Sequence, residues 1–510
     1  MNEKNSEANI VAARAQKLNR LKKQKINAYP SAAVPHTPLA EVLAHAKRHC
    51  KTPEFEDKES FSVAGRVRAI RGQGKIVFID LADVDTRMQI VAKADVLEEE
   101  QKLIPLLDIG DFIWVEGNTF CTKRGEHSIA AQSLKILTKS MRPLPDKWSG
   151  LKDQETRQRQ RYVDLIMNPE VRQLFQLRSQ FMQHFRNAII NQKFLEVETP
   201  VLEHVPGGAD AEPFSTHHQS LDIDLYLRIS LELHLKRVMV GGLERVFEIG
   251  RVFRNEGMST QHLQEFTMLE FYWAYNDYNT LMEMVEQLYA EVIKKTFGST
   301  VIKRQSKPDL DFTPPWPRTS YAEAVRKHSG VDIIKASDSA ITDALKKLKV
   351  QPVAGRARQI DQLYKKTTRP HLDKVQFLID PPLILSPLAK PHADNDQLAE
   401  RFWVLLDGAE VGNGFSELND PTDQKARFEE QEKMRLEGDD EAQRMDHDYV
   451  RALEYGMPPA AGFGVGIDRL FSILANQESI RDVVLFPTMR PEREEVAAKI
   501  NKSAKIKKDE

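Results

Sequence analysis

The stretch VFEIGRVFRNEGMSTQHLQEFTMLEFYWAY (residues 246–275) places charged residues inside two runs of large apolar residues. Ionised side chains are seldom buried unless they are paired or have a function. If the second run is a strand, alternation divides it into two faces, with Phe266, Met268, Glu270, Tyr272 and Ala274 opposite Leu269, Phe271, Trp273 and Tyr275. The sequence therefore predicts a hairpin in which an aromatic ring, a carboxylate and a phenol share one surface.

Two interpretations of this hairpin are open from the residues alone. Its charged side chains could face water from one side of an antiparallel pair. However, Trp273 and Phe271 indicate that one face packs on a core, while Phe266 and Tyr272 make the other face too apolar for simple solvation. We therefore favour a sheet whose second face is the floor of a binding site.

Length and composition indicate a soluble globular protein of two or three domains. The chain has 510 residues, of which 41% are hydrophobic and 29% charged, with a formal net charge of −2. No apolar run approaches the roughly 20 residues of a membrane span, and the N-terminus lacks a signal-peptide core, so we expect a cytoplasmic protein. Cys50 and Cys121 are far apart in sequence, which argues against structural disulfides and cysteine-ligated zinc.

The first 60 residues are expected to form a basic, helical N-terminal extension. Residues 12–25 (AARAQKLNRLKKQK) favour a helix, and a charged tail is expected at residues 493–510. Both segments could simply be solvated, as charge-rich helices and chain ends usually are. For the N-terminal helix, a phosphate-binding arm is the functional alternative.

Residues 61–140 contain five short runs of strand-forming residues, FSVAGRVRAI, KIVFIDLAD, RMQIVAKA, FIWVEGNTF and SIAAQSLKIL. Five such runs favour a small β-barrel of the oligonucleotide-binding (OB) type. Two prolines and a glycine in MRPLPDKWSG then predict an interdomain linker at residues 141–154. A larger domain is expected to follow at residues 155–492.

The larger domain is expected to contain a helix from Pro169, which Asn168 can cap. Apolar residues at helical spacing form one stripe on it, which could pack on the core or make a subunit contact: Leu174, Leu177, Phe181, Phe185 and Ile189. From Glu232 we expect mainly strands as far as about residue 320. The run GFGVGIDRL (residues 462–470) alternates glycines, so a strand here has a face without side chains on which a flat ligand could lie, and a helix should start near Ile467. By itself this glycine pattern is a weak signal.

Together these segments resemble the class II aminoacyl-tRNA synthetases, and over nearly its full length the chain is similar to the lysyl-tRNA synthetases. FRNEG (residues 253–257) resembles the second motif of the class, GFGVGIDRL its third, and the helix from Pro169 followed by FLEVETPVL its first, dimer-forming motif. PGGADAEPFSTHH, YLRISLELHLKR, VGNGFSELND and RPLPDKWSGLKDQETRQRQRYVDL resemble segments of the lysine family. The resemblance implies an α+β fold, with a five-stranded OB-type barrel followed by a catalytic domain built on an antiparallel sheet flanked by helices.

The resemblance also implies an activity. Members of the family use ATP and Mg²⁺ to convert lysine to lysyl-adenylate and pyrophosphate, and then transfer the lysyl group to the 3′ end of tRNA(Lys). Because the lysine carboxylate attacks the α-phosphorus, catalysis consists mainly of alignment and charge neutralisation. A homodimer is expected as well.

Site residues are carried over from the matching motifs. Arg254 is expected to contact the lysine carboxylate and α-phosphate and, with Glu256 and Arg469, to be catalytic. Phe266 should stack on adenine with Arg469 on its other face, a cation–π arrangement that also reaches phosphate. The remaining ATP-binding residues are expected to be His262, Glu410, which would also hold the metal, and Gly466.

Lysine recognition is expected at the buried acids, because a buried ammonium needs carboxylate partners. Glu417 and Tyr272 would bind the ε-ammonium, with Glu270 beside them. Glu232 and the backbone of Gly208 would bind the α-ammonium, and the pocket would be lined by Asn413 and Phe415. From the residues alone, each acid could instead form a surface salt bridge.

The barrel resembles the anticodon-binding domain of the family, in which an aromatic side chain stacks on unpaired bases and polar side chains read base edges. The matching positions are Arg71, Phe78, Gln89 and Glu126. From its pattern alone, Phe78 could equally belong to the barrel core.

Three departures from the family pattern are visible. Leu231 stands where the family usually has proline, and HLQEF (residues 262–266) stands for the usual HNPEF. Seven residues before Glu410, the family has a second metal-binding glutamate, whereas this chain has Trp403. Tryptophan cannot replace a carboxylate on Mg²⁺, so either Glu410, water and phosphate suffice or catalysis is impaired. The second case would make the chain a catalytically weak paralogue that regulates by binding tRNA or nucleotide. A further alternative is an enzyme that attaches lysine to a protein. The barrel argues against this further alternative.

Overall fold

The computed structural model describes residues 2–31, 34–52, 55–72, 75–145, 151–305, 307–436 and 442–491. The chain divides into two compact units. Unit 1 comprises Met1–Arg157 and Tyr162–Pro169, and unit 2 comprises Gln158–Arg161 and Glu170–Glu510. The tail expected at residues 493–510, and residues 146–150 of the expected linker, lie outside the described residues.

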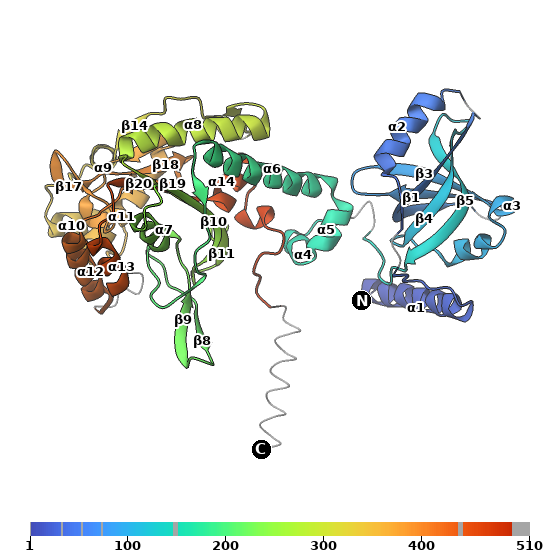
Figure 1. The fold of residues 1–510 in the computed structure, drawn as a ribbon, viewed down its shortest axis with the longest axis horizontal. Helices are drawn as coiled ribbons and strands as arrows, with labels where there is room; N and C mark the ends of the chain where they lie inside the picture. Colours follow the sequence, from blue (N-terminus) through green and yellow to red (C-terminus); the bar gives the residue numbers. More distant parts are fainter. Residues whose placement is uncertain are drawn as a thin grey trace, which may run out of the picture. The chain divides into compact units, whose positions relative to one another are not determined.

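Unit 1 is built on a closed β-barrel, as the five apolar runs predict (Figure 1). Around the barrel the strands follow the order β1-β2-β3-β5-β4. Their bounds are β1 (Glu56–Arg71), β2 (Ile76–Ala82), β3 (Arg87–Lys93), β4 (Phe112–Cys121) and β5 (His127–Thr138). Val63, Val67, Ile79, Ile90 and Ile129 are fully buried, so the barrel interior is filled with branched side chains.

Helices precede β1, separate β3 from β4, and follow β5 in the sequence. They are α1 (Asn2–Lys23), α2 (Leu39–His49), α3 (Ala94–Leu97), the 3₁₀ helix η1 (Glu100–Leu106), α4 (Gln154–Arg159) and α5 (Arg161–Met167). On α1, Arg14 donates to the carbonyl oxygens of Ser140 at 3.0 Å and Ile109 at 2.9 Å, and Lys17 pairs with Asp108 at 2.7 Å. These two cations of the basic helix are therefore bound to unit 1 itself, which corrects the expectation of a solvated helix at these positions.

Unit 2 contains an eight-stranded sheet in the order β14-β15-β18-β19-β20-β11-β10-β6. The bounds are β6 (Leu195–Glu196), β10 (Arg245–Phe253), β11 (Glu265–Ala274), β14 (Arg318–Ser320), β15 (Gln376–Ile379), β18 (Arg401–Leu406), β19 (Ala409–Ser416) and β20 (Ala460–Gly466). The centre of the sheet is antiparallel, as expected, while β14 with β15 and β10 with β6 form parallel pairs at the two edges.

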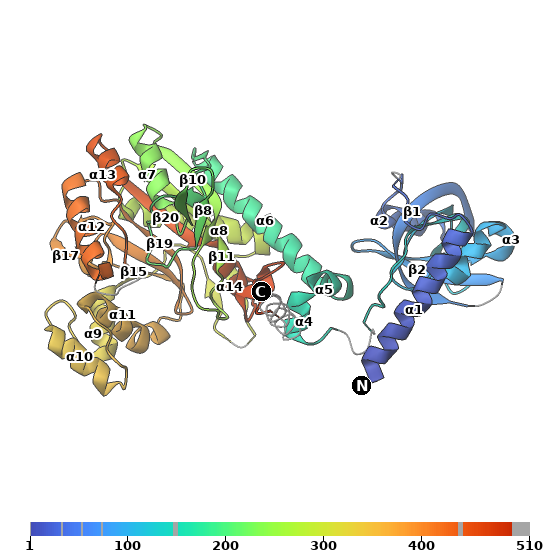
Figure 2. The same ribbon diagram turned by 90° about the horizontal axis from the view of Figure 1, so that it is seen from below.

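Helices cover both faces of this sheet (Figures 1 and 2). One face packs on α6 (Pro169–Asn191), α8 (Tyr278–Phe297) and α14 (Ile467–Leu474), and the other on α7 (Glu232–Val240), α12 (Pro421–Leu436) and α13 (His447–Glu454). The apolar stripe predicted on α6 enters the first core, where Phe181, Phe185 and Ile189 are fully buried. Asp468 of α14 accepts a hydrogen bond from the Thr267 backbone at 2.7 Å and pairs with Arg178 of α6, so it joins both elements to the sheet.

The expectation of mainly strands from Glu232 to about residue 320 is wrong, because α7 and α8 lie in this interval. The helix α8 has both of its termini encoded locally. The Asp277 side chain accepts from the Thr280 backbone at its start, and Gly298 adopts a left-handed conformation at its end. Tyr275 also lies outside β11, with φ of 61° and 67% exposure, so the predicted strand ends one residue earlier.

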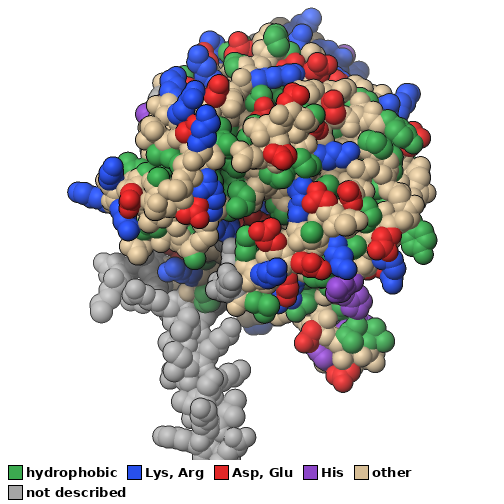
Figure 3. Space-filling view, turned by 90° about the vertical axis from the view of Figure 1, so that its left-hand side faces the viewer, with side chains coloured by type: hydrophobic (Ala, Val, Ile, Leu, Met, Phe, Trp, Pro, Cys, Tyr) green, Lys and Arg blue, Asp and Glu red, His purple; other side chains and the backbone are tan. Residues whose placement is uncertain are grey.

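The remaining elements form small sheets and a helical segment. They are β7 (Leu202–Glu203), β8 (Ser215–His218), β9 (Ile223–Leu227), β12 (Val301–Ile302), β13 (Leu310–Asp311), β16 (Pro391–His392), β17 (Asn395–Ala399), α9 (Tyr321–Ser329), α10 (Asp338–Lys347), α11 (Arg356–Thr367), η2 (Arg369–His371), η3 (Leu383–Leu385) and η4 (Ile480–Val483). On the side of unit 2 near α10 and α12, acidic and basic side chains are intermixed over the surface in view (Figure 3). Within the described ranges, no helix is long and apolar enough to cross a membrane.

Candidate active site

A cavity of about 910 Å³ lies on the face of the sheet that carries α7, α12 and α13. Its floor includes Phe266, Met268, Glu270 and Tyr272 of β11, which are the residues that strand alternation places on one face. Phe271, between them in sequence, is fully buried in the opposite core. The prediction that the second face of the hairpin is a binding floor is therefore consistent with the geometry.

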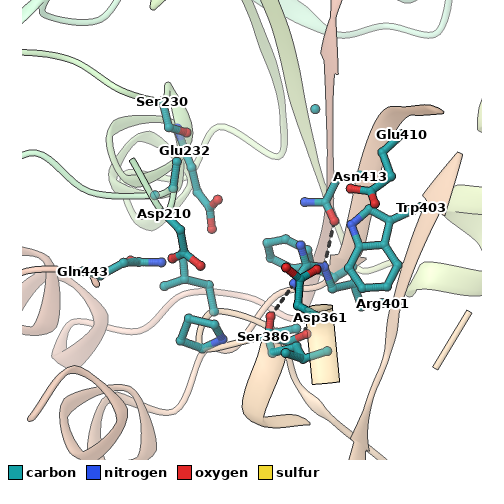
Figure 4. Close-up of a pocket in the computed structure, with 18 of the residues that line it drawn as sticks. Asp210, Ser230, Glu232, Asp361, Ser386, Arg401, Trp403, Glu410, Asn413 and Gln443 are labelled. Carbon is teal, nitrogen blue, oxygen red and sulfur yellow. Dashed lines mark hydrogen bonds between the residues drawn. The ribbon is translucent and has the colours of Figure 1, made fainter. Parts of the chain in front are cut away.

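Two sides of the cavity carry different types of side chain (Figure 4). Asp210, Ser230 and Glu232 lie together on one side, and Arg401, Trp403, Glu410 and Asn413 lie on the other. All of these residues belong to unit 2. The first side carries two acids, the exposed Asp210 and the buried Glu232, and the second combines the cation Arg401 with the aromatic ring of Trp403.

Glu270 is the central acid of the floor and is only 3% exposed. Its Oε1 accepts from the Ser230 hydroxyl at 3.0 Å and from the Leu231 backbone at 3.1 Å, and its Oε2 accepts from the Tyr272 hydroxyl at 3.1 Å. Burial, and then the charge of Glu232, raise the pKa of Glu270 to about 7. The Leu231 bond depends on a departure from the family pattern, because proline at this position would have no N–H to donate.

Lys236 of α7 is fully buried and lies between the two other acids. Its Nζ donates to Glu232 Oε1 at 2.6 Å and forms an ion pair with Glu417. Burial opposes the charge on Lys236, but the two carboxylates outweigh burial and raise its pKa. The alternative of surface salt bridges does not hold for these acids, since Glu232 is 6% exposed and Glu417 fully buried.

Glu417 has one carboxylate oxygen without a protein partner. Its Oε1 is buried and accepts no hydrogen bond from any residue that the structure describes. An unpaired buried acceptor costs about 1–3 kcal/mol, and more when it is charged. Burial raises the pKa of Glu417, and the nearby Lys236 ammonium opposes this rise. The oxygen is thus an acceptor available to a ligand.

Two glycines make room for this acidic side of the cavity. A Cβ at Gly462 would lie 2.1 Å from Glu417 Oε1 and 2.4 Å from the Tyr272 ring, so the face of β20 that lacks side chains is filled here by those two residues. This corrects the expectation that a flat ligand lies along that face at Gly462. Gly208 has φ of +83°, and a Cβ there would lie 2.9 Å from the Glu232 Cβ.

The other predicted nucleotide residues also line the cavity. The Arg254 guanidinium lies 5.3 Å from the centre of the Phe266 ring, and its Nε donates to the Ile229 carbonyl oxygen at 3.1 Å. Arg469 donates to the carbonyl oxygens of Glu410 at 3.1 Å and Gln261 at 3.4 Å. Glu256, His262 and Gly466 lie on the same cavity wall.

The loop that carries His262 has Gln264 where the usual HNPEF has proline. The Gln264 side chain donates from Nε2 to the Glu256 carbonyl oxygen at 3.3 Å, a bond that proline could not form. The backbone carbonyl of Gln264 accepts from the Arg254 N–H at 2.8 Å. Burial, and then Arg469, lower the pKa of His262, which favours the neutral imidazole at pH 7. The loop is therefore held to the residues that it would position.

Trp403 stands beside Glu410 in the cavity (Figure 4). The Arg401 guanidinium lies 4.5 Å from the centre of its ring, and Tyr321 packs 5.6 Å from it. Arg401 in turn donates to Asn413 Oδ1 at 2.8 Å and to the Leu385 carbonyl oxygen at 2.7 Å. Asn413 therefore lines the pocket as expected, but its side-chain oxygen is already bound by Arg401.

Comparison with known proteins assigns the chain to a family. A family model described as tRNA synthetases class II (D, K and N) matches residues 153–490, and one described as an OB-fold nucleic acid binding domain matches residues 61–137. A lysine–tRNA ligase of Moorella thermoacetica is 47% identical over 493 residues, which cover 96% of this chain and 99% of that protein. Lysine–tRNA ligases of Pelotomaculum thermopropionicum and Dehalococcoides mccartyi are 48% and 45% identical, and cover 84% and 94% of this chain, and 86% and 97% of their own lengths.

The chain belongs to the lysyl-tRNA synthetase family. It is a class II synthetase with an OB-fold barrel and a mixed sheet, which confirms the family and the fold expected from the sequence.

The structure places Arg71, Phe78 and Gln89, three of the four barrel residues expected to read bases, on the adjacent strands β1, β2 and β3, and the fourth, Glu126, just before β5. Phe78 pairs with Arg71 across β2 and β1, and Gln89 pairs with Asp80 across β3 and β2. Phe78 is half-buried between the buried Val77 and Ile79, so its side chain lies outside the barrel core. Arg71 bonds Asp80 at 2.6 Å, and Glu126 lies exposed just before β5, next to the strand that pairs with Gln89.

Lys236 and Arg401 contribute to this synthetase site but were not predicted from the sequence. The spacing of Glu232 and Lys236, four residues apart on a helix, could have revealed the buried ion pair had α7 been predicted as a helix. Arg401 follows a turn and had no pattern of its own. Conversely, Glu248 of the opening hairpin is structural, because it pairs with Arg228 at 2.7 Å and accepts from the Thr199 hydroxyl at 2.6 Å.

Proposed function

We propose that this chain activates lysine with ATP and transfers the lysyl group to tRNA(Lys). The observation that supports this most directly is the buried, unpaired Oε1 of Glu417. It lies beside Gly462 and Tyr272, which line the cavity together with Glu232 and Glu270. Three carboxylates and the single ammonium of Lys236 leave two negative charges when all are ionised. Lysine brings two ammonium groups, so its binding would balance this excess, whereas a neutral side chain would leave a buried carboxylate unpaired.

In this proposal, the ε-ammonium binds Glu417 and the Tyr272 hydroxyl, with Glu270 alongside. The α-ammonium binds Glu232 and the backbone of Gly208. Lys236 has a positioning role, because it holds the Glu232 and Glu417 carboxylates at a fixed separation. Phe415 closes the pocket, with its ring 5.3 Å from Lys236 Nζ.

The lysine carboxylate would then approach Arg254, which is the cation nearest to the Phe266 ring. Arg254 orients this carboxylate toward the α-phosphorus, and Arg469, which also lines the cavity, neutralises phosphate charge. Adenine stacks on Phe266, with Glu256 and His262 as hydrogen-bonding partners of the nucleotide. No proton has to move to or from the protein in the adenylation step.

The carboxylates of the cavity fit a magnesium ion that is held largely by the nucleotide. Glu410 offers oxygen to the cavity, while Trp403 offers none and is stacked on Arg401. Asp361 of α11 also lines the cavity, where it pairs with Lys365 at 2.8 Å. Mg²⁺ usually keeps waters and phosphate oxygens and needs only one or two protein carboxylates. When bound, the ion neutralises phosphate charge; Glu410 is the residue that we assign to it.

Exposed apolar side chains support the proposed homodimer. Ile190, Leu195, Val201 and Leu202 are 43%, 51%, 39% and 46% exposed. Ile190 lies at the end of α6, Leu195 on β6 at the edge of the eight-stranded sheet, and Val201 and Leu202 at the start of β7. Exposed apolar residues and an edge strand are features of surfaces that pair with another chain. Sedimentation equilibrium should give twice the chain mass of 58.3 kDa; a monomer at micromolar concentration would contradict the dimer. A cytoplasmic location, where tRNA is found, is part of the same proposal.

Lysine-dependent exchange of pyrophosphate into ATP, measured over a range of Mg²⁺ concentrations, tests the activity. We expect exchange in the wild type, a lower half-saturating Mg²⁺ concentration in Trp403→Glu, and no such decrease in the control Trp403→Phe. Absence of exchange at saturating ATP, lysine and Mg²⁺ would refute the proposed activity. An unchanged Mg²⁺ requirement in Trp403→Glu would refute only the metal assignment.

The two alternative functions gain no support. The relatives compared above are named lysine–tRNA ligases over nearly the whole chain, which does not favour a regulatory paralogue. A protein-lysylating enzyme is not favoured either, because the barrel is complete.

A further inference from the structure

Two histidines of α2 lie one helical turn apart, far in sequence from the active site. His45 and His49 have ring centroids 4.2 Å apart and ring planes within 9° of each other. Residues four apart share one face of a helix, and α2 is anchored because Leu39, Val42 and Ala46 are buried against the barrel. The two imidazoles are therefore held in place as a pair.

The facing strand β1 supplies two carboxylates to the same place. Asp57 Oδ2 lies 2.7 Å from His45 Nε2, and Glu59 Oε2 lies 3.7 Å from it. One ligand atom from each of His45, His49 and Asp57 lies within 4.8 Å of the others. Donors around a tetrahedral zinc ion are about 3.3 Å apart, so small side-chain rotations would bring the three into coordination distance.

The backbone of β1 is irregular where these acids lie. Its pairing with β4 shifts register between Glu56 and Ser60, and the Asp57 carbonyl oxygen instead accepts from Asn118 Nδ2 at 2.8 Å. Such bulges change the direction in which side chains project from the strand. The Asp57 carboxylate is oriented further, because its Oδ1 accepts from the Glu59 backbone at 3.2 Å, which leaves Oδ2 for His45.

A simple ion pair between His45 and Asp57 explains only part of this arrangement. The His49 imidazole forms no hydrogen bond or ion pair within the described part of the chain, yet it is stacked on His45. Two stacked imidazoles would repel each other if both were protonated, whereas neutral imidazoles can bind one cation together. Imidazole nitrogen combined with carboxylate oxygen is a donor set that suits Zn²⁺ and similar metals, and it differs from the all-oxygen sets of Mg²⁺.

From this geometry we infer that His45, His49 and Asp57 form a binding site for a zinc-like divalent cation, which Glu59 or water completes as fourth ligand. The ion links α2 to β1 and so fastens the N-terminal helical segment to the barrel. The site lies within unit 1 and is independent of the proposed lysine activation in unit 2.

Metal binding to the full-length chain tests this site without reference to activity. The metal-free protein is titrated with Zn²⁺, and with Co²⁺ for its tetrahedral absorption, in the presence of excess Mg²⁺. We compare the wild type with His49→Ala and Asp57→Asn. His49 is exposed, so its loss should leave folding intact. His328→Ala is the matched control, because His328 and His371 also stack, at 4.6 Å, but belong to no three-residue metal-binding group among the described residues.

We expect one high-affinity Zn²⁺ per chain in the wild type and in His328→Ala. Removal of supporting residues around a metal typically weakens affinity 10- to 100-fold, and removal of a ligand should reach roughly 100-fold or more. Equal zinc affinity in the wild type and His49→Ala would overturn the inference. So would a wild type that binds no Zn²⁺, since His45 and Asp57 would then form an ion pair only.

Discussion

The acidic side of the cavity and the outer face of the barrel use similar residue types in different surroundings. Glu270 and Tyr272 of the cavity floor and the adjacent Glu417 are nearly inaccessible to water, while on the barrel Phe78 is half-buried and Arg71 is exposed. A charge that is unpaired in a dry site costs several kcal/mol, but an exposed ion pair such as Arg71–Asp80 contributes roughly 0–1 kcal/mol. Substitutions in the cavity should therefore have much larger effects than substitutions on the barrel face.

Glu417→Gln is expected to have the largest effect. It removes the buried charge that we assign to the ε-ammonium and leaves Lys236 with Glu232 as its remaining acidic partner. We expect kcat/KM for lysine in pyrophosphate exchange to fall roughly 10²- to 10³-fold, with a much smaller change in KM for ATP.

The control for this variant is Glu286→Gln, which alters a buried acid bound to the Trp316 backbone outside the cavity. It should lower stability without changing lysine selection. Equal losses for lysine and ATP in Glu417→Gln would contradict the assignment of Glu417.

The titration of Glu270 should have the next largest effect. With its pKa at about 7 in the free enzyme, Glu270 is protonated below pH 7 and cannot balance an ammonium. We therefore expect kcat/KM for lysine to fall by up to tenfold per pH unit below about 7, and Glu270→Gln to lack this step. A wild-type kcat/KM for lysine that is constant between pH 5.5 and 8 would show that Glu270 does not take part in lysine binding.

The stability of the fold should depend on the same titration in the opposite direction. Protonation of Glu270 weakens lysine binding but stabilises the folded state. Because the pKa of Glu270 is raised on folding from 4.5 to about 7, the folded state holds a proton that the unfolded state has lost in this interval. The free energy of unfolding should therefore decrease, relative to that of Glu270→Gln, as pH rises from 4.5 to 7. Urea unfolding at several pH values measures this difference.

Phe78→Ala should have the smallest effect and a different character. Stacking of a base on an aromatic ring is worth about 1–3 kcal/mol, so kcat/KM for tRNA charging should fall roughly 5- to 150-fold while pyrophosphate exchange stays unchanged. Phe112→Ala, which alters another half-buried barrel aromatic, should leave charging near the wild-type rate. A parallel loss of exchange in Phe78→Ala would show that the barrel does not act separately from the catalytic unit.

The sequence was most informative where side chains alternate. The face of β11 from Phe266 to Tyr272 follows from a period of two, and the barrel follows from five runs of similar length. The start of α6 was found from Asn168 and Pro169. These features are local, so a pattern in neighbouring residues is enough to reveal them.

What could not be predicted depends on contacts between distant segments. Lys236 of α7 meets Glu417, which directly follows β19, although the two residues are 181 positions apart in the chain (417 − 236). The unpaired Oε1 of Glu417 and the position of Arg401 beneath Trp403 likewise require the assembled sheet. α7 was mistaken for strand because its Leu and Val residues suit either structure in a nine-residue segment.

The glycine at position 462 determines the depth of the proposed lysine pocket. Since a methyl carbon there would lie 2.1 Å from Glu417 Oε1, the depth of the pocket is set by an atom that β20 lacks. Residue 462 is therefore the first position to change if the pocket is redesigned for a diamino acid whose side chain is one methylene shorter than that of lysine. Volume added at residue 462 would meet both the Glu417 carboxylate and the Tyr272 ring, so these two side chains would have to move.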